Sequence, residues 1–228
     1  MEPKSEQEVR DTIASQIVKA RKQDETQGYA DRRDMGGYQV VLGGLANYFD
    51  YIKQNKDRLG SNLVIDVGAG KGIAVRTMKM NPMTEGLSIG ATVLKVTNEV
   101  RENVGQDLLY ATPVEKLRGI KDNSVAGIIS VYGMAYSQVP SEAVASIDRV
   151  LVPGGVVKAV FNHKRIESST NLNQLTPEDF AREFYKRNYD VIIPEYQMSK
   201  VLLALKRPAF STALELFEKD KAVMQLRG

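Results

Sequence analysis

Residues 62–76 carry the most informative pattern of the chain and read Asn-Leu-Val-Ile-Asp-Val-Gly-Ala-Gly-Lys-Gly-Ile-Ala-Val-Arg. Leu63–Ile65 form a short apolar run, which is typical of a buried parallel strand, and Asp66 stands where that strand would end. Three glycines then predict a tight turn, and Ile73–Met80 predicts a helix. A ligand above the strand end would meet side-chain-free backbone, the N–H groups that open the helix, and the Asp66 carboxylate.

Two common nucleotide-binding loops do not fit this turn. The phosphate-binding loop ends in Gly-Lys-Ser/Thr, but Gly72 is followed by Ile73, and Ile73 also stands where the dinucleotide fingerprint has its third glycine. A glycine-rich turn without a ligand is the plain alternative. The remaining pattern, Asp-x-Gly-x-Gly-x-Gly, resembles motif I of the class I S-adenosylmethionine-dependent methyltransferases.

Two further segments are similar to this family. Residues 122–130, Asp-Asn-Ser-Val-Ala-Gly-Ile-Ile-Ser, look like its fourth-strand segment, and residues 149–155, Arg-Val-Leu-Val-Pro-Gly-Gly, look like its turn into the fifth strand. The resemblance covers roughly Leu63 to Leu205. It implies a seven-stranded sheet with a reversed last strand and methyl transfer from S-adenosylmethionine.

Length and composition set limits on what the chain can do. Its 228 residues suffice for one α/β domain with a small cap, and the net charge of +3 neither demands nor excludes nucleic acid. The chain has no cysteine and a single histidine, so we expect no disulfide and no metal site. No apolar run approaches the roughly 18 residues that span a bilayer, and the polar start is unlike a signal peptide. We therefore expect a cytoplasmic protein without a membrane partner.

The order of apolar patterns predicts an α/β fold, with a doubly wound, seven-stranded, mostly parallel sheet and a helical N-terminal cap. We expect residues 1–60 to form the cap or lid, with helices near residues 9–18 and 41–52, the second containing Gly43 and Gly44 and ending before Gly60. Residues 61–228 would form the cofactor-binding core. Its later strands are expected at 86–93, 108–111, 125–132, 156–161, 191–194 and 198–205, and its later helices at 94–104, 143–151, 176–185 and 211–225.

The resemblance implies a set of cofactor-binding residues, with three departures from the family pattern. A hydroxyl, Thr92, stands where most members carry a carboxylate for the ribose, as in the cyclopropane-synthase and sterol-methyltransferase branch. The usual Asp-Ala beside the adenine is absent, so a backbone N–H near Val114 or Glu115 would read the base, and Ala126 replaces a frequent Asp. The implied set is Asp66, Gly68, Ala69, Gly70, Gly72, Thr92, Val114, Glu115, Ser130 and Val131.

Methyl transfer mainly requires alignment of acceptor, methyl group and sulfur, and it needs a base only when the acceptor is protonated. The reacting centre is expected above the fourth strand, where Tyr132 and Tyr136 would line an acceptor pocket or simply pack. His163, the single histidine, could serve as a base or be an exposed loop residue. Tyr29 and Tyr38 could close over the cofactor from the cap.

Other features of the sequence disfavour or exclude some classes of methyl acceptor. No Asn/Asp-Pro-Pro-Tyr/Phe/Trp follows the fourth strand, which disfavours the amino-methylating DNA and glutamine enzymes, and the lack of cysteine excludes thiol nucleophiles. Lys158, Lys164 and Arg165 form a basic group that we expect on a solvated rim, or else facing an acidic substrate.

Three hypotheses on function follow. The first is a methyltransferase for a small-molecule acceptor. The second is an RNA or protein methyltransferase, which would want a basic, aromatic surface beyond the core. The third is a binding or scaffold protein that keeps the fold without catalysis. Acceptor, pathway and oligomeric state are left open.

Overall fold

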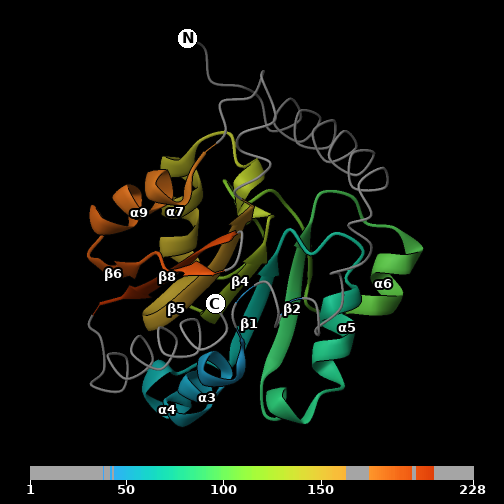
Figure 1. The fold of residues 1–228 in the computed structure, drawn as a ribbon. Coiled ribbons are helices and arrows are strands. Elements are labelled where there is room, and N and C mark those ends of the chain that lie inside the picture. Colours follow the sequence, from blue (N-terminus) through green and yellow to red (C-terminus); the bar gives the residue numbers. More distant parts are fainter. Residues whose placement is uncertain (1–37, 39–41, 43, 163–174, 197–198, 208–228) are drawn as a thin grey trace.

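A mostly parallel β-sheet organises the protein (Figure 1). The computed structural model describes residues 38, 42, 44–162, 175–196 and 199–207. Seven strands run in the order β3-β2-β1-β4-β5-β8-β6, and the short β7 pairs with β8. Only β8 runs against its neighbours β5 and β6, so the predicted seven-stranded sheet with a reversed last strand is confirmed. The strands are β1 (Leu63–Val67), β2 (Ser88–Val93), β3 (Leu109–Ala111), β4 (Val125–Val131), β5 (Leu151–Asn162), β6 (Tyr189–Ile192), β7 (Glu195–Tyr196) and β8 (Ser199–Lys206).

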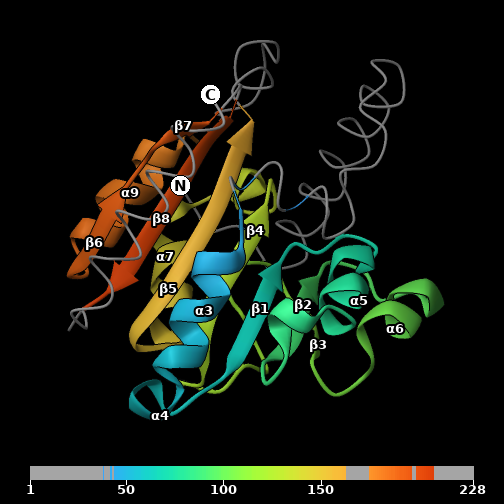
Figure 2. The same cartoon turned by 60° about the horizontal axis from the view of Figure 1, so that its bottom comes forward.

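Helices cover both faces of the sheet (Figures 1 and 2). One face carries α3 (Ala46–Gln54), α4 (Lys56–Leu59), α5 (Ile73–Lys79) and α6 (Asn98–Val104), and the other carries α7 (Pro140–Val150) and α9 (Pro177–Tyr185). Short 3-10 turns lie at η1 (Pro82–Thr84) and η2 (Met134–Tyr136). In β1, Val64 faces the first layer and Ile65 the second, which explains the unbroken apolar run of a strand covered on both sides.

Local signals set several element ends. Thr176 and Asp179 form a reciprocal capping box at the start of α9, where a helix was expected at 176–185. Gly60, with φ of 63°, ends α4 where a stop was expected. The expectation that Gly44 lies inside a helix is wrong, because its φ of 107° is incompatible with helix and α3 begins only at Ala46. The helices expected at 9–18 and 211–225 lie outside the described residues.

Two tyrosines of α3 donate hydrogen bonds to β5 where the register between β4 and β5 shifts. Val125 pairs with Leu151 but Gly127 pairs with Val156, so the predicted Pro-Gly-Gly turn is absorbed as extra residues within β5. The Tyr51 hydroxyl donates to the Gly154 carbonyl at 2.7 Å, and the Tyr48 hydroxyl donates to the Val156 carbonyl at 3.3 Å. A Cβ on Gly127 would lie 2.3 Å from the Tyr48 oxygen, so this glycine makes room for the helix.

Candidate functional site

The glycine-rich loop lies at the carboxyl end of β1. Gly68, Gly70 and Gly72 all have positive φ, at 78°, 60° and 75°, a conformation that favours glycine. Thr92 on β2 holds the loop in place: its side-chain oxygen accepts from the Gly68 N–H at 3.1 Å, and its carbonyl accepts from the Ala69 N–H at 3.0 Å. The Thr92 hydroxyl, which we expected near a ribose, is therefore also part of the loop's support.

Asp66 is a buried carboxylate with one satisfied and one unsatisfied oxygen. The Tyr38 hydroxyl donates to Asp66 Oδ2 at 2.9 Å, whereas Oδ1 has no hydrogen-bond partner among the described residues. Burial raises the pKa of Asp66 to about 7, and the hydrogen bond from Tyr38 opposes part of that rise. A buried acceptor without a donor costs free energy, so a ligand amine that donates to Asp66 Oδ1 would remove this cost.

The end of β4 is fastened to the same loop. The Ser130 hydroxyl donates to the Val67 carbonyl at 2.9 Å and accepts from the Met134 N–H at 3.0 Å. A Cβ on Gly68 would lie 2.8 Å from Gly133 Cα, so the two backbones pass each other in close contact. Ser130 is thus a structural clamp between the two strand ends.

Tyr132 and Tyr136 follow the end of β4. Tyr132 has a φ of 63°, which is unusual for a residue with a large side chain, and its N–H donates to the Val160 carbonyl at 3.2 Å. Tyr136 closes η2, and both tyrosines and Val131 are partly exposed. Gly133, which follows Tyr132, packs against Gly68 of the glycine-rich loop, and a reacting centre at the two tyrosines stays a prediction.

The segment after β3 is fastened to the segment after η2. Glu115 is buried, and its Oε1 accepts from the Ser137 hydroxyl and from the Gln138 N–H, each at 2.7 Å. Its Oε2 has no partner in the described structure. The N–H groups of Val114 and Glu115 also have no acceptor among the described residues, which leaves them available to read a base edge. This side-chain role of Glu115 was not predicted, because its partners lie more than twenty residues away in the chain.

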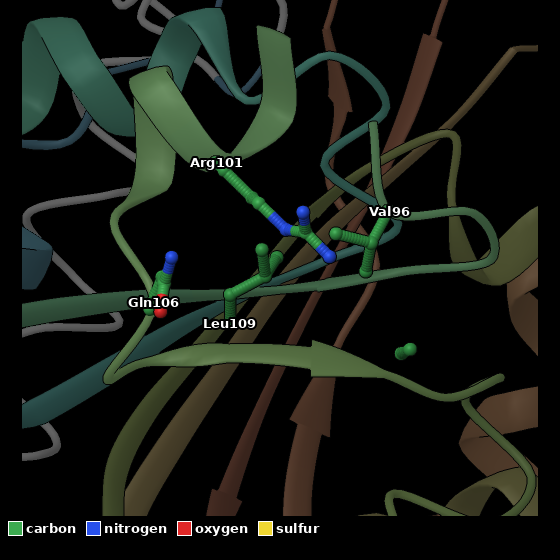
Figure 3. A pocket seen from close by; sticks show the side chains of 5 residues that line it. Val96, Arg101, Gln106 and Leu109 are labelled. Carbon is green, nitrogen blue, oxygen red and sulfur yellow. The ribbon is translucent and has the colours of Figure 1, made fainter. Parts of the chain in front are cut away.

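A pocket of about 410 Å³ lies between α6 and the edge strand β3 (Figure 3). Arg101 extends from α6 toward Val96, over the Leu109 side chain. The lining combines apolar side chains with Arg101 and Gln106 and contains no carboxylate. It consists of Val96, Arg101, Gln106, Leu109 and Ala111. The sequence singled out none of these five, because the pairing of β3 with β2 brings them together.

Lys158 is not part of a solvated rim, so that expectation is wrong. Its side chain is fully buried, and its Nζ donates to the Gly44 carbonyl at 2.8 Å, in the segment that precedes α3. Tyr29, His163, Lys164 and Arg165 lie outside the described residues.

The described part of the chain has neither a candidate metal site nor a candidate membrane span. No group of three or more His, Cys, Asp or Glu side chains is placed to hold a metal ion. No helix in the same part is long and apolar enough to cross a membrane.

Comparison with known proteins relates the central part of the chain to one family. Residues 65–158, from β1 to the middle of β5, match a family described as a methyltransferase domain. No curated protein matches the chain.

Two solved structures share the fold. One is the S-adenosylmethionine-bound amino pentose methyltransferase of calicheamicin biosynthesis from Micromonospora echinaspora, with 13% identity over 70% of this chain and 91% of that one and a TM-score of 0.52. The other is the 1,6-didemethyltoxoflavin-N1-methyltransferase of Burkholderia thailandensis, with bound 1,6-didemethyltoxoflavin and S-adenosylhomocysteine, with 16% identity over 90% and 92% and a TM-score of 0.51. Together with the glycine-rich loop, these findings lead to one conclusion: residues 65–158 carry a methyltransferase domain, and the chain has the fold of S-adenosylmethionine-dependent methyltransferases, which supports S-adenosylmethionine as its methyl donor.

Proposed function

We propose that this methyltransferase acts on a small-molecule acceptor, and that it holds its cofactor across the carboxyl ends of β1, β2 and β4. The observation that carries the placement is Asp66, a buried carboxylate with one oxygen unsatisfied, beside a loop of three glycines in positive φ. The amino group of the cofactor's amino-acid part is a donor of the kind that Asp66 Oδ1 lacks.

The remaining residues of the site have distinct roles in this proposal. The glycine-rich loop lets the cofactor approach the backbone, and Ser130 keeps that loop joined to β4. The N–H groups of Val114 and Glu115 read the adenine edge, and Thr92 lies near the ribose. Because Thr92, near the end of β2, stands where most members carry a carboxylate, we expect the ribose hydroxyls to be held less tightly than in those members.

The cofactor, when bound, supplies an electrophilic methyl group on a sulfonium. The protein then has to exclude water and align the acceptor with that methyl group. We place the acceptor beside Tyr132 and Tyr136, next to the glycine-rich loop, and we keep His163 as the candidate base. The small-molecule class is supported by the two structural relatives, whose acceptors are an amino pentose and 1,6-didemethyltoxoflavin.

Two measurements test the proposal. Calorimetric titration with S-adenosylhomocysteine should show binding, and ligand at 100 times its Kd should raise the free energy of unfolding by about 2.7 kcal/mol. Asp66→Asn should abolish most of the affinity, whereas Asp57→Asn, on the exposed surface of α4, should bind like the wild type.

The acceptor class needs a second readout. Radiolabelled S-adenosylmethionine is incubated with the enzyme and with three fractions of a cell extract: small molecules, RNA and protein. Enzyme-dependent label in a small-molecule product that is separate from S-adenosylmethionine and its breakdown products supports the proposal. Label confined to RNA or protein would overturn it, and salt-sensitive binding to RNA would point the same way.

A further inference from the structure

Tyr38 contacts the Asp66 carboxylate from a part of the chain that lies outside the methyltransferase match. The family match starts at residue 65, whereas Tyr38 precedes α3. Its side chain is 5% exposed, and its hydroxyl donates to Asp66 Oδ2 at 2.9 Å across 28 residues of sequence. Leu42 and Leu45, from the same segment, are fully or almost fully buried. These three side chains are therefore packed into the protein, and the phenol of Tyr38 lies beside Asp66.

We propose that Tyr38 is a positioning residue for the methyl donor: by occupying one oxygen of Asp66, it turns the other oxygen toward the amino group of the bound amino-acid moiety. The inference rests on the proposed function, because it assumes that Asp66 binds that amine. It adds that the segment before α3 helps to set cofactor affinity, although its tyrosine acts only through Asp66.

The other polar groups on this side of the sheet have different partners. The Tyr48 hydroxyl, from α3, donates to the Val156 carbonyl, and Lys158 Nζ, from β5, donates to the Gly44 carbonyl. Asp66 pairs with Ile129, and Ile129 with Lys158, so Lys158 lies two strands away, about 9–10 Å in the sheet. Among the described residues, Tyr38 is the one recorded donor to the Asp66 carboxylate.

The hydrogen bond also acts on the charge of Asp66. A donor stabilises the ionised carboxylate, and Tyr38 lowers the pKa of Asp66 against the larger effect of burial. A cationic amine binds the ionised form, so affinity should fall as the pH drops through the pKa of Asp66. Without the phenol that pKa rises further, and the loss of affinity begins at higher pH.

The test compares two ligands and three proteins. S-adenosylhomocysteine carries the amino-acid moiety, whereas 5′-methylthioadenosine shares the adenosine and sulfur but lacks it. We expect Tyr38→Phe to lower the affinity for S-adenosylhomocysteine about tenfold at pH 7. The affinity for methylthioadenosine should change less than about twofold. The control is Tyr51→Phe, whose hydroxyl bonds the Gly154 carbonyl instead, and it should bind both ligands like the wild type.

A pH series separates positioning from mere packing. The pH at which S-adenosylhomocysteine affinity begins to fall should rise in Tyr38→Phe, while the methylthioadenosine profile stays flat. Equal affinity and an unchanged profile in the variant would overturn the inference and leave the proposed function intact. Equal weakening of both ligands would also overturn it, because a packing defect affects both. Failure of the wild type to bind either ligand would instead defeat the proposed function.

A second substitution covers the case in which Tyr38→Phe does not fold. Incorporation of 3-fluorotyrosine at position 38 keeps the ring and makes the phenol a stronger donor. The proposal predicts tighter S-adenosylhomocysteine binding and a pH profile shifted downward. An unchanged profile would contradict it.

Discussion

Asp66 combines a binding role with a cost to stability. Its burial raises its pKa from 3.8 to about 7, which means that the fold disfavours its ionised form. Below about pH 4 the carboxyl is neutral in both the folded and the unfolded chain. Between about pH 4 and pH 7 the unfolded chain ionises while the folded one keeps its proton, so stability falls in that window and levels off above it. At neutral pH, a neutral amide at position 66 would therefore make the ligand-free protein more stable than the carboxylate does.

Asp66→Asn should therefore stabilise the ligand-free protein at neutral pH. The difference of about three pKa units corresponds to about 4 kcal/mol at pH 8, and we expect a gain of about 2–4 kcal/mol there. Near pH 4 the two proteins should differ by less than about 1 kcal/mol. Urea unfolding of both proteins across this range measures the difference. A variant less stable than the wild type at pH 8 would refute the assigned charge state.

A matched pair of glycines tests the shape of the loop. Gly72 and Gly60 both have positive φ, at 75° and 63°, so alanine is strained at either position by about 1 kcal/mol. At Gly72 the new Cβ would also lie 2.5 Å from Val104 Cγ2, whereas nothing lies within 4 Å at Gly60. We expect Gly72→Ala to lose about 1–3 kcal/mol more than Gly60→Ala in urea unfolding. Equal losses would show that α6 packs elsewhere.

At the scale of elements, Glu115 joins two segments that border the site. Glu115→Ala would leave the Ser137 hydroxyl and the Gln138 N–H without their acceptor, and we expect a loss of about 2–4 kcal/mol in urea unfolding. Glu142→Ala is the control, because its exposed ion pair with Lys116 should contribute less than about 1 kcal/mol. Similar small effects for both variants would show that the buried contact is not formed.

The sequence predicted the core elements well because their signals are local. The run before Asp66, the helix expected at 176–185 and the stop at Gly60 each depend on a few neighbouring residues, and all three elements are found. The buried state of Lys158 could not be predicted, because it depends on a carbonyl 114 residues away. The pairing of Tyr38 with Asp66 is of the same long-range kind: the sequence suggested the tyrosine as a lid residue but not its partner.

For the whole molecule, the strand order predicts a gradient of protection. Strands β1 and β4 have partners on both sides, whereas β3 and β6 each have a single partner. Hydrogen exchange followed by mass spectrometry should show the slowest exchange in β1 and β4 and faster exchange at β3 and β6. Exchange in β3 as slow as in β1 would contradict the edge position of β3.

The reversed strand β8 has a consequence for synthesis on the ribosome. β6 pairs with β8 and with no other strand of the described sheet, and β5 has β8 as its second neighbour. Until residues 199–206 leave the exit tunnel, the nascent chain carries β5 with one bare, apolar edge. Such an edge can pair with other chains, so production of this protein should depend on how fast β8 is translated, or on a chaperone that shields β5 until then.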